Sequence, residues 1–430
     1  MKQIINIPPA ATKRVVIVGG GFAGTELVKG LLKTSYQIVL FDKNNFYQFQ
    51  PLLYQVAMSG LEPSAISFPL RRIFRHKKRF FFRMAEVTNI NPKQNEVETN
   101  IGSLSYDYLV LSGGVTTNFF GNKELEKKAF TMKSVSDAIF IRNAILENYE
   151  RALDYETDEE RQPFLNLVIV GGGPAGVELA GSLAEMKKFI LPKDYPELDF
   201  NKMKVYIFEA GPKILSNMRE NSSTTALKYL KKLGIDVQTG IAVQDYDGEN
   251  VKLSTGEILK SKMMIWTAGV TAKRTRGMDE KMFGPGGRIL TDRINKVQGA
   301  DNIFAIGDIS LMQTEKFPKG HPQVAQVAMQ QARHLAKNFS KIAKGKQPVP
   351  FKYIDKGMMA TVGRNLAIAD LPGVSFKGFF AWLLWSVVHL ISIMGSKNKV
   401  FVFLDWATNY YVYDPSLRLL IKPKLRNGEA

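Results

Sequence analysis

The sequence contains no cysteine among its 430 residues. This absence excludes disulfide bonds and every mechanism that needs a thiolate as nucleophile, redox pair or metal ligand. Histidine is also scarce, with only His76, His321, His334 and His389 scattered along the chain. None of these spacings is typical of a zinc site. We therefore expect neither thiol chemistry nor a bound metal.

The amino-terminal residues, MKQIINIPPAATKR, lack the apolar segment and the small-residue cleavage site of a secretory signal. We therefore expect the protein to face the cytoplasm. Acidic residues are in the minority, with 40 Asp and Glu against 58 Lys and Arg, so the formal net charge is +18. Such an excess attracts anionic surfaces, but it does not distinguish nucleic acid from phospholipid.

One basic block, residues 71–83 (RRIFRHKKRFFFR), alternates cations with aromatic side chains. Binders of single-stranded nucleic acid use this combination, yet no RNA-binding or helix-turn-helix signature accompanies it. We interpret the block as a solvated or membrane-facing strip and predict no nucleic-acid partner. Salt-dependent binding of DNA would support the alternative.

Two glycine-rich turns are the most informative feature of the chain. Each follows an apolar run: VVIVGGGFAGTE at residues 15–26 and VIVGGGPAGVE at residues 168–178. In Gly-x-Gly-x-x-Gly, the glycines permit a tight turn, the approach of backbone N–H groups to a pyrophosphate, and close packing of the next helix on the sheet. A single copy is a weak signal, whereas two copies predict two bound dinucleotides. The six glycines are Gly19, Gly21, Gly24, Gly171, Gly173 and Gly176.

An acidic residue follows each turn at the end of a later strand: Asp42 closes QIVLFD and Glu209 closes VYIFE. A carboxylate in this place accepts hydrogen bonds from a ribose hydroxyl. The second acid comes later than usual, which indicates an inserted helix and loop at residues 187–202. A carboxylate there would repel a 2′-phosphate and favour NADH over NADPH, and the alternative is a solvated glutamate that ends a strand.

The order of segments predicts one nucleotide-binding unit inserted into another. Strand and helix patterns alternate over residues 13–111, and an acidic exposed helix and connector (147–161) precede the second turn. The second unit closes with a strand at residues 263–270. A strand ending in Gly-Asp (301–308) and a helix (323–339) then return to the first unit. At 430 residues the chain is long enough for two or three domains.

This arrangement resembles the flavoproteins with two dinucleotide-binding domains, and within them the type II NADH dehydrogenases, which are single-chain NADH:quinone oxidoreductases. The resemblance covers nearly the whole chain. Residues 109–115 (LVLSGGV) depart from the Ala-Thr-Gly turn of the superfamily, although Ser112 is small enough for the same turn. The matching segments are QFQPLLYQVA (48–57), WTAGV (266–270), IFAIGD (303–308), AQVAMQ (325–330) and YIDKGMMATVGRNLAIA (353–369).

The resemblance implies an α/β fold with two Rossmann-like domains. It places FAD in the split domain (residues 1–118 and 286–350), NADH in the inserted domain (119–285), and a membrane anchor at residues 351–430. It adds four cofactor-binding residues to the glycines and acids above, with Asp308 assigned to the ribityl chain of FAD. These four are Gly269, Gly307, Asp308 and Ala325.

Three further residues are predicted to act in catalysis. Gln326 and Gln330 share a helix face, and their amides can donate to quinone carbonyls without bringing a charge into an apolar site. From the residues alone they are equally the polar face of an amphipathic helix, and only the resemblance favours the quinone. Glu178 lies in the first turn of its helix, where a carboxylate is favoured electrostatically. The resemblance makes it a candidate proton donor to quinone.

The carboxy-terminal run GFFAWLLWSVVHLISIM (378–394) is marginal for a membrane span, which needs about 20 apolar residues. Ser386, His389 and Ser392 form a narrow polar stripe. We therefore predict a helix lying in the membrane interface, with tryptophans at headgroup level and nearby lysines on anionic lipid. Residues 400–406 and 410–413 would complete the apolar patch, and a buried core helix or a homodimer interface is the alternative.

We therefore predict a monotopic enzyme on the cytoplasmic face of the inner (cell) membrane that uses FAD, oxidises NADH and reduces menaquinone or ubiquinone without pumping protons. The absence of cysteine excludes disulfide reductases and sulfide:quinone oxidoreductases, both of which need it. Two alternatives are retained: a membrane flavoprotein that senses NADH, and one that reduces another acceptor such as ferredoxin. Rapid NADH-driven turnover with quinone would eliminate the sensor.

Overall fold

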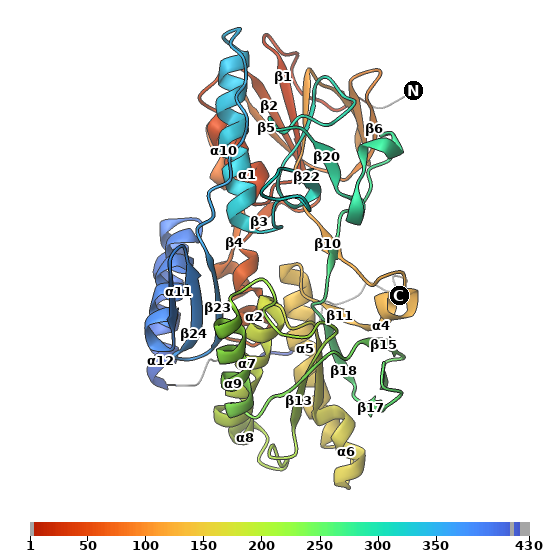
Figure 1. Cartoon of the computed structure of the whole chain (residues 1–430), viewed down its shortest axis with the longest axis vertical. Helices are drawn as coiled ribbons and strands as arrows, with labels where there is room; N and C mark the ends of the chain where they lie inside the picture. The colour runs from red at the N-terminus through yellow and green to blue at the C-terminus, as the bar shows by residue number, and fades with distance from the viewer. Residues whose placement is uncertain (1–3, 413–416, 422–430) are drawn as a thin grey trace. The chain divides into compact units, whose positions relative to one another are not determined.

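The computed structural model describes residues 4–412 and 417–421. The chain forms two compact units, and each is built from segments that are separated in sequence (Figure 1). Unit 1 consists of Met1–Gln48, Phe68–Thr116 and Val270–Asp355. Unit 2 consists of Phe49–Ser67, Thr117–Gly269 and Lys356–Ala430. Most of unit 2 is thus inserted into unit 1, as the order of sequence motifs predicts.

A five-stranded parallel sheet forms the centre of unit 1. Its inner strands are apolar and buried on both faces, as is usual where helices cover both sides of a parallel sheet. Helices α1 (Phe22–Leu31) and α10 (Ala325–Ile342) pack so closely that only glycine fits at position 30. A side chain there would place its Cβ 2.4 Å from the Cβ of Ala336. In sheet order the strands are β21 (Ile303–Ala305), β9 (Tyr108–Leu111), β1 (Arg14–Val18), β2 (Gln37–Asp42) and β5 (Phe80–Met84).

Smaller sheets complete unit 1, and the basic block of residues 71–83 runs from α3 (Leu70–Ile73) into the edge strand β5. One of these sheets is antiparallel, and another is a parallel pair. Their strands are β6 (Val87–Asn91), β7 (Glu96–Thr99) and β8 (Gly102–Ser105), then β20 (Ile289–Thr291) and β22 (Ser310–Met312).

Unit 2 repeats the central design with a second parallel sheet. Its glycine-turn helix α7 (Pro174–Phe189) has 16 residues, against 10 in α1, and α8 (Leu191–Asp194) follows it. This is the predicted insertion before Glu209. In sheet order the strands are β11 (Phe130–Thr131), β18 (Met263–Trp266), β12 (Asn166–Val170), β13 (Lys204–Glu209) and β14 (Asp236–Thr239).

Four further helices and a small antiparallel sheet surround this sheet (Figure 1). The helices are α4 (Lys123–Lys128), α5 (Val135–Ala152), α6 (Asp158–Leu165) and α9 (Glu220–Lys232). The strands are β15 (Val243–Tyr246), β16 (Asn250–Leu253) and β17 (Ile258–Lys260). Helix α4 lies beside β15 of the small sheet.

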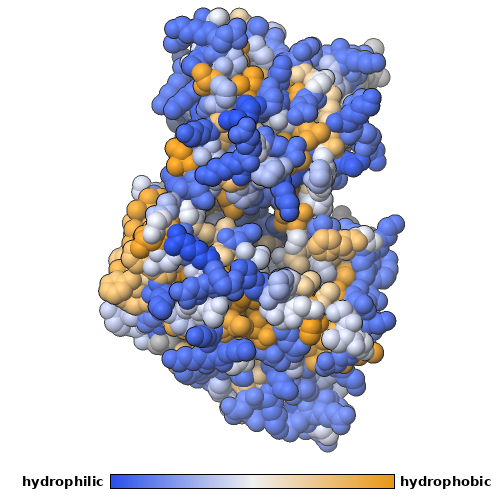
Figure 2. All heavy atoms as spheres, viewed as in Figure 1, coloured by the Kyte–Doolittle hydropathy of each residue, from blue (hydrophilic) through white to orange (hydrophobic). Residues whose placement is uncertain are grey.

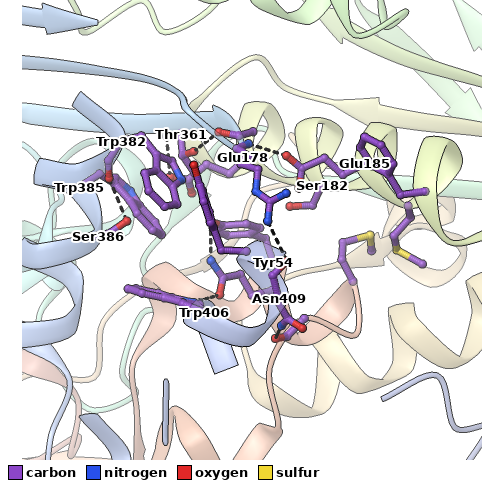
Figure 3. Close-up of a pocket in the computed structure, with 18 of the residues that line it drawn as sticks. Tyr54, Glu178, Ser182, Glu185, Thr361, Trp382, Trp385, Ser386, Trp406 and Asn409 are labelled. Carbon is purple, nitrogen blue, oxygen red and sulfur yellow. Dashed lines mark hydrogen bonds between the residues drawn. The ribbon is translucent and has the colours of Figure 1, made fainter. Parts of the chain in front are cut away.

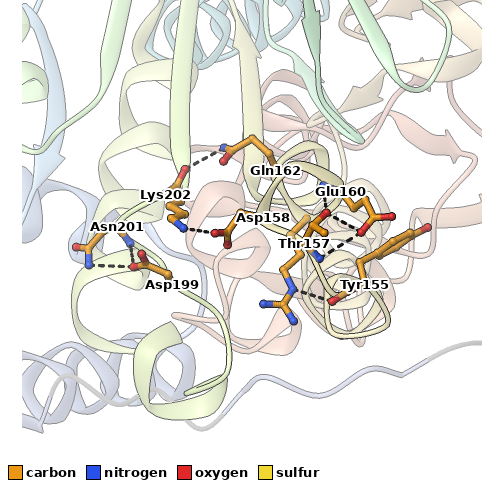
Figure 4. A network of polar contacts seen from close by, with 9 residues as sticks. Tyr155, Thr157, Asp158, Glu160, Gln162, Asp199, Asn201 and Lys202 are labelled. Carbon is orange, nitrogen blue, oxygen red and sulfur yellow. Dashed lines mark hydrogen bonds and ion pairs between the residues drawn. The ribbon is translucent and has the colours of Figure 1, made fainter.

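The acidic stretch 147–161 contains the end of α5, a short connector and the start of α6 (Figure 4). A capping box begins α6: the Thr157 hydroxyl accepts from the Glu160 amide, and the Glu160 carboxylate accepts from Thr157. Asp158 pairs with Lys202, and Gln162 donates to the Lys202 carbonyl. These polar contacts thus cap α6 and fasten it to Lys202, which lies two residues before β13 begins.

The carboxy-terminal part of unit 2 is a three-stranded antiparallel sheet followed by two helices. Helix α7 packs against β23 so closely that a Cβ at Gly181 would lie 1.7 Å from the Val362 carbonyl oxygen. Its elements are β23 (Met358–Gly363), β24 (Leu366–Leu371), β25 (Val374–Lys377), α11 (Phe379–Ser392) and α12 (Ser396–Val412).

The segment Phe49–Ser67, which contains α2 (Leu53–Ala57), folds with this carboxy-terminal part although the sequence assigns it to the first domain. Helix α12 holds it by polar side chains: the Asn398 amide donates to the carbonyls of Ser64 and Ala65, at 3.0 Å each. No helix in the described part of the chain is both long and apolar enough to cross a membrane. Residue 413 of the predicted apolar patch lies outside the described residues.

Candidate active site

The two glycine turns have nearly the same geometry. Gly19 and Gly171 have φ angles of +101° and +107°, a region that side chains disfavour. A Cβ at the third glycine of either turn would meet the carbonyl oxygen of the first, at 1.9 Å for Gly24 and 2.1 Å for Gly176. Each turn therefore tolerates only glycine at these positions.

The middle glycines differ from the others in a way that indicates ligands. A Cβ added to Gly21 or to Gly173 would meet none of the described atoms within 4 Å. The space in front of these residues is open, and the amino termini of α1 and α7 begin there. Free backbone N–H groups at a helix start bind pyrophosphate. Both turns thus fit the pyrophosphate of a dinucleotide, as the sequence predicts.

Strand register settles the placement of the two predicted acids. Val18 lies opposite Phe41 and Val170 lies opposite Phe208, so Asp42 and Glu209 occupy corresponding positions beside the turns. The Asp42 carboxylate accepts from the Gly20 amide at 2.6 Å, and the Glu209 carboxylate accepts from the Gly172 amide at 2.7 Å. Burial raises the pKa of Asp42, and hydrogen bonds from backbone amides oppose this effect. Both acids brace their turns, and each oxygen keeps a lone pair for a ribose hydroxyl.

The departure at residues 109–115 preserves the turn. The Ser112 hydroxyl donates to the carbonyls of Val18 and Gly19, both at 2.9 Å. In unit 2, the Thr267 hydroxyl makes the matching pair of bonds to Val170 and Gly171, at 2.9 and 3.1 Å. Serine and threonine do the same work because only the hydroxyl is needed.

Unit 1 also brings Gly307 and Asp308 to the start of α10. Gly307 has a φ of +76°, and a Cβ there would lie 3.4 Å from the Cβ of Ala328. Its amide donates to the buried Gln331 side chain at 2.7 Å, and the Gln323 amide donates to the Asp308 carbonyl at 2.9 Å. Ala325 is the first residue of α10. The sequence did not single out Gln331 as a residue that supports Gly307. The one hint was that a second glutamine follows Gln330 directly.

The predicted quinone-binding glutamines lie in the first turns of α10, in unit 1. Gln330 is largely engaged: its amide nitrogen donates to the Ile354 carbonyl at 2.8 Å, and its oxygen accepts from the Ile354 amide at 3.0 Å. One N–H of this side chain is left for another acceptor. Gln330 therefore ties the chain after α10 back to the helix, whatever else it binds.

A cavity of about 180 Å³ lies within unit 2 and is lined by α2, α7, β23, α11 and α12 (Figure 3). We call it the α7 cavity. Aromatic rings and polar side chains line it in similar numbers. The residues that matter below are Tyr54, Gln55, Glu178, Ser182, Glu185, Thr361, Arg364, Trp385, Trp406, Asn409 and Tyr410.

Glu178 is the buried acid of this cavity, with 8% of its surface exposed. Burial raises its pKa to about 8, although the Thr361 amide (3.4 Å) and the Trp385 indole favour the charged form. The neighbouring Tyr54 hydroxyl accepts from the Gln55 amide at 2.9 Å, and Gln55 in turn accepts from the Trp406 indole at 2.8 Å. At pH 7 Glu178 is therefore mostly a neutral acid that can donate a proton.

Comparisons with known proteins agree with this geometry. Residues 13–332 match the pyridine nucleotide-disulphide oxidoreductase family, and residues 356–412 match the NDH2 C-terminal domain. The type II NADH:quinone oxidoreductase Ndh of Mycobacterium tuberculosis is 35% identical to this chain over 94% of it and 89% of the relative. The chain belongs to the type II NADH:quinone oxidoreductases.

Further relatives extend the match. The type II NADH:quinone oxidoreductase of Staphylococcus haemolyticus is 30% identical, over 85% of this chain and 91% of the relative. The structure of NDH2 from Plasmodium falciparum in complex with NADH superposes with a TM-score of 0.87, at 23% identity, over 95% of this chain and all of that one, which shows the shared fold. The predictions of family, of fold, and of an oxidoreductase that uses FAD and NADH are confirmed.

The sequence predicts that the tryptophans of α11 lie at the level of the lipid headgroups. In this type II NADH:quinone oxidoreductase, however, the Trp385 side chain is buried inside the protein. It is 2% exposed, and its ring stacks on His389 with centroids 4.1 Å apart and lies 5.6 Å from the Trp406 ring. The prediction was wrong because α12 folds back over this face of α11. The Ser386 and Ser392 hydroxyls donate to carbonyls four residues earlier, and His389 Nδ1 bonds the Trp385 carbonyl, so these polar atoms have partners within the helix.

The remaining faces of α11 and α12 are apolar and exposed. Figure 2 shows an orange region over these two helices, at the left of the view. The most exposed apolar residues of the two helices are Phe380 (72%), Ile391 (66%), Val400 (56%), Phe403 (55%), Tyr411 (82%) and Val412 (63%).

Gly269 is the last of the predicted cofactor-binding residues. Its φ is +71°, and a Cβ at this position would lie 2.8 Å from the Phe120 ring.

Proposed function

We propose that FAD binds at the glycine turn of unit 1, that NADH binds at the turn of unit 2, and that the quinone ring enters the α7 cavity beside Glu178. Bound FAD supplies hydride acceptance and electron release. The net reaction joins NADH, one proton and the quinone to give NAD⁺ and the quinol. The open space in front of Gly21 and Gly173 supports the two nucleotide sites.

In this proposal Glu178 donates the proton that comes from the protein. Its burial keeps the carboxyl neutral near pH 7, and the aromatic walls of the cavity suit a flat apolar ring. We expect Glu178→Gln to slow quinone reduction by about 100-fold, the scale of a lost general acid. Bleaching of the flavin by NADH should be unchanged.

Anaerobic stopped-flow absorbance measures the two half-reactions separately, first with NADH and then with a soluble quinone. A Glu178→Gln enzyme that reoxidises at the wild-type rate would remove Glu178 from proton donation. An enzyme that bleaches with NADH but does not recover with any quinone would instead indicate another acceptor.

Gln326 and Gln330 belong to unit 1 and do not line the α7 cavity, and they stay candidates for hydrogen bonds to the quinone carbonyls only through the family resemblance. Replacing both with leucine should slow reoxidation of the flavin by quinone and leave its reduction by NADH intact. Equal loss of both half-reactions would remove them from the quinone site. Because Gln330 also bonds Ile354, the single Gln326→Leu variant keeps the test free of that structural role.

We further propose that α11 and α12 lie in the membrane interface, with the enzyme on the cytoplasmic face and an isoprenoid quinone, either menaquinone or ubiquinone, as substrate. The support is the exposed apolar surface of both helices together with a net charge of +18, which attracts anionic lipid. Phe380 and Ile391 are exposed on α11, so changing them should leave the core intact.

Flotation with vesicles that contain anionic phospholipid tests this surface. The double change Phe380→Glu and Ile391→Glu should abolish binding, whereas the control Ile258→Glu, at a residue 62% exposed on β17, should not. Undiminished binding of the double variant would refute the anchor. A stable dimer in detergent-free buffer that the double variant loses would assign the surface to a homodimer instead.

A further inference from the structure

Helix α7 presents three polar residues to the cavity from a single face. Glu178, Ser182 and Glu185 are spaced four and three residues apart, so they lie one above the other along the helix. All three line the α7 cavity, where Figure 3 shows them side by side on the same helix. Glu178 is buried and the other two are partly buried, and removing such polar groups from water costs free energy, so this row indicates a role beyond packing.

Glu185, at the other end of this row from Glu178, lies close to the cationic residue Arg364. The Glu185 carboxylate accepts from the Arg364 amide, and the Arg364 guanidinium donates to the Asn409 carbonyl at 2.8 Å and lies 4.2 Å from the centre of the Tyr410 ring. Burial raises the pKa of Glu185, and the charge of Arg364 opposes this effect. Burial therefore makes Glu185 easier to protonate than an exposed glutamate.

Polar side chains also line the cavity between Glu178 and Glu185. Tyr54, from α2, is close enough to both Glu178 and Glu185 for their charges to raise its pKa. The Ser182 hydroxyl faces the cavity from the intervening turn and can both accept and donate. A cavity of about 180 Å³ has room for water molecules that would bridge these groups.

A second observation indicates that this cavity receives a polar ligand. Trp385 is 2% exposed, and its indole N–H lies on the cavity wall. The indole interacts with the Glu178 carboxylate closely enough to favour its charged form, but this contact falls short of ordinary hydrogen-bond geometry, and the indole has no other partner in the described part of the chain. A buried indole N–H normally has a partner. A water molecule or a substrate oxygen beside Glu178 would supply one.

We propose that Glu185 and Ser182, with water in the α7 cavity, form a proton path that reloads Glu178 from solvent during quinone reduction. This inference rests on the proposed function of Glu178. Oxidation of NADH releases two electrons and one proton, whereas the quinol holds two electrons and two protons, so each turnover takes one proton from solvent. That proton passes from solvent to the Glu185 carboxylate, then through water and the Ser182 hydroxyl to Glu178, and finally to a quinone oxygen.

Charged and titratable groups lie at both ends of the path. Arg364 contacts Glu185 at one end, and the Tyr54 hydroxyl lies near both acids. At the Glu178 end, the neighbouring groups are the Thr361 amide and the Trp385 indole, with His389 behind the indole. Burial lowers the pKa of His389 to about 4, so it is neutral and does not compete for the proton. Because Glu185 is partly exposed and Glu178 is buried, Glu185 is the entry of the proposed path and Glu178 is its exit.

The test measures steady-state quinone reduction from pH 6 to 9, in water and in heavy water, together with flavin reduction by NADH in the stopped-flow instrument. Glu185→Gln should slow quinone turnover about tenfold and increase the solvent isotope effect, and Ser182→Ala should slow it about threefold. Glu185→Asp should restore most of the rate. Flavin content and flavin reduction by NADH should match the wild-type enzyme in all three variants.

Glu159→Gln is the matched control, because this carboxylate is exposed on α6 in the same unit and outside the cavity. A Glu185→Gln enzyme with wild-type turnover and isotope effect would overturn the path. So would equal slowing of both half-reactions, since that pattern indicates a structural role. If Glu178→Gln also turns over normally, the proposed function of Glu178 fails; if Glu178→Gln is slow and Glu185→Gln is normal, only the path fails.

Discussion

Glu26 and Glu178 occupy the same place in two copies of one motif, two residues after the third glycine, yet their surroundings differ. The Glu26 carboxylate contacts the Arg333 guanidinium at 2.6 Å and the Lys29 ammonium at 3.6 Å, and its side chain is 18% exposed. Glu178 is buried among aromatic rings, and within the described residues no lysine or arginine pairs with it. One is a surface ion pair and the other is a buried acid.

The contrast shows that the motif determines backbone geometry and leaves side-chain chemistry to the tertiary environment. Helix α1 packs on α10, which supplies the arginine, whereas α7 packs on β23 and α2, which supply an amide and a phenol. The longer α7 also carries Ser182 and Glu185 into the cavity. Three matched pairs of variants test how far the two copies correspond.

The largest effect should come from valine at the two middle glycines. Gly21→Val and Gly173→Val should both fold, because a Cβ at either position meets no described atom within 4 Å. A valine would crowd the pyrophosphate, so Gly21→Val should be purified without flavin. Gly173→Val should keep its flavin and lose affinity for NADH by about 100-fold, or about 2.7 kcal/mol.

Absorbance at the flavin band per protein, and the NADH dependence of bleaching, measure the two outcomes. The proposed division of cofactors would be contradicted if Gly173→Val lost the flavin while Gly21→Val retained it.

The next effect concerns stability at high pH. The pKa of Glu178 is raised from 4.5 to about 8 in the folded state, so its contribution is fully present below about pH 4.5 and is lost as the pH rises through 8. Between pH 5 and pH 9 the wild-type protein should lose on the order of 3–5 kcal/mol relative to Glu178→Gln. Glu26→Gln should change stability by less than about 1 kcal/mol at either pH.

Thermal unfolding of the three proteins at both pH values compares them directly. Parallel losses of stability in the wild-type protein and Glu178→Gln would show that Glu178 is not the buried neutral acid described above.

The smallest effect concerns the two acids that end β2 and β13. Glu209→Gln should keep one of the amide contacts and remove the charge that repels a 2′-phosphate, so the preference for NADH over NADPH in kcat/KM should fall about tenfold. Asp42→Asn, the corresponding change in unit 1, should leave this preference unchanged. An undiminished preference in Glu209→Gln would place the selecting group elsewhere.

Much of the fold could be predicted from the sequence because its signals are local. The apolar strands β1 and β12, the glycine turns that follow them, and the acids at the ends of β2 and β13 were all predicted near their observed positions. The candidate site was less predictable. Tyr54, Gln55 and Arg364 reach the α7 cavity from segments far apart in the chain, and although these segments carry the family resemblance, nothing in them assigned the three residues to a site.

The sequence by itself determined the two dinucleotide turns, the insertion of one unit into the other and the exclusion of thiol chemistry, because glycine conformation, strand hydrophobicity and the absence of a residue type do not depend on distant contacts. Only the tertiary structure decided that Glu178 is a buried neutral acid, that Trp385 lines a cavity, and that Gln330 bonds Ile354. Charge state, burial and hydrogen bonding depend on which distant residues surround a side chain, and folding alone brings those residues together.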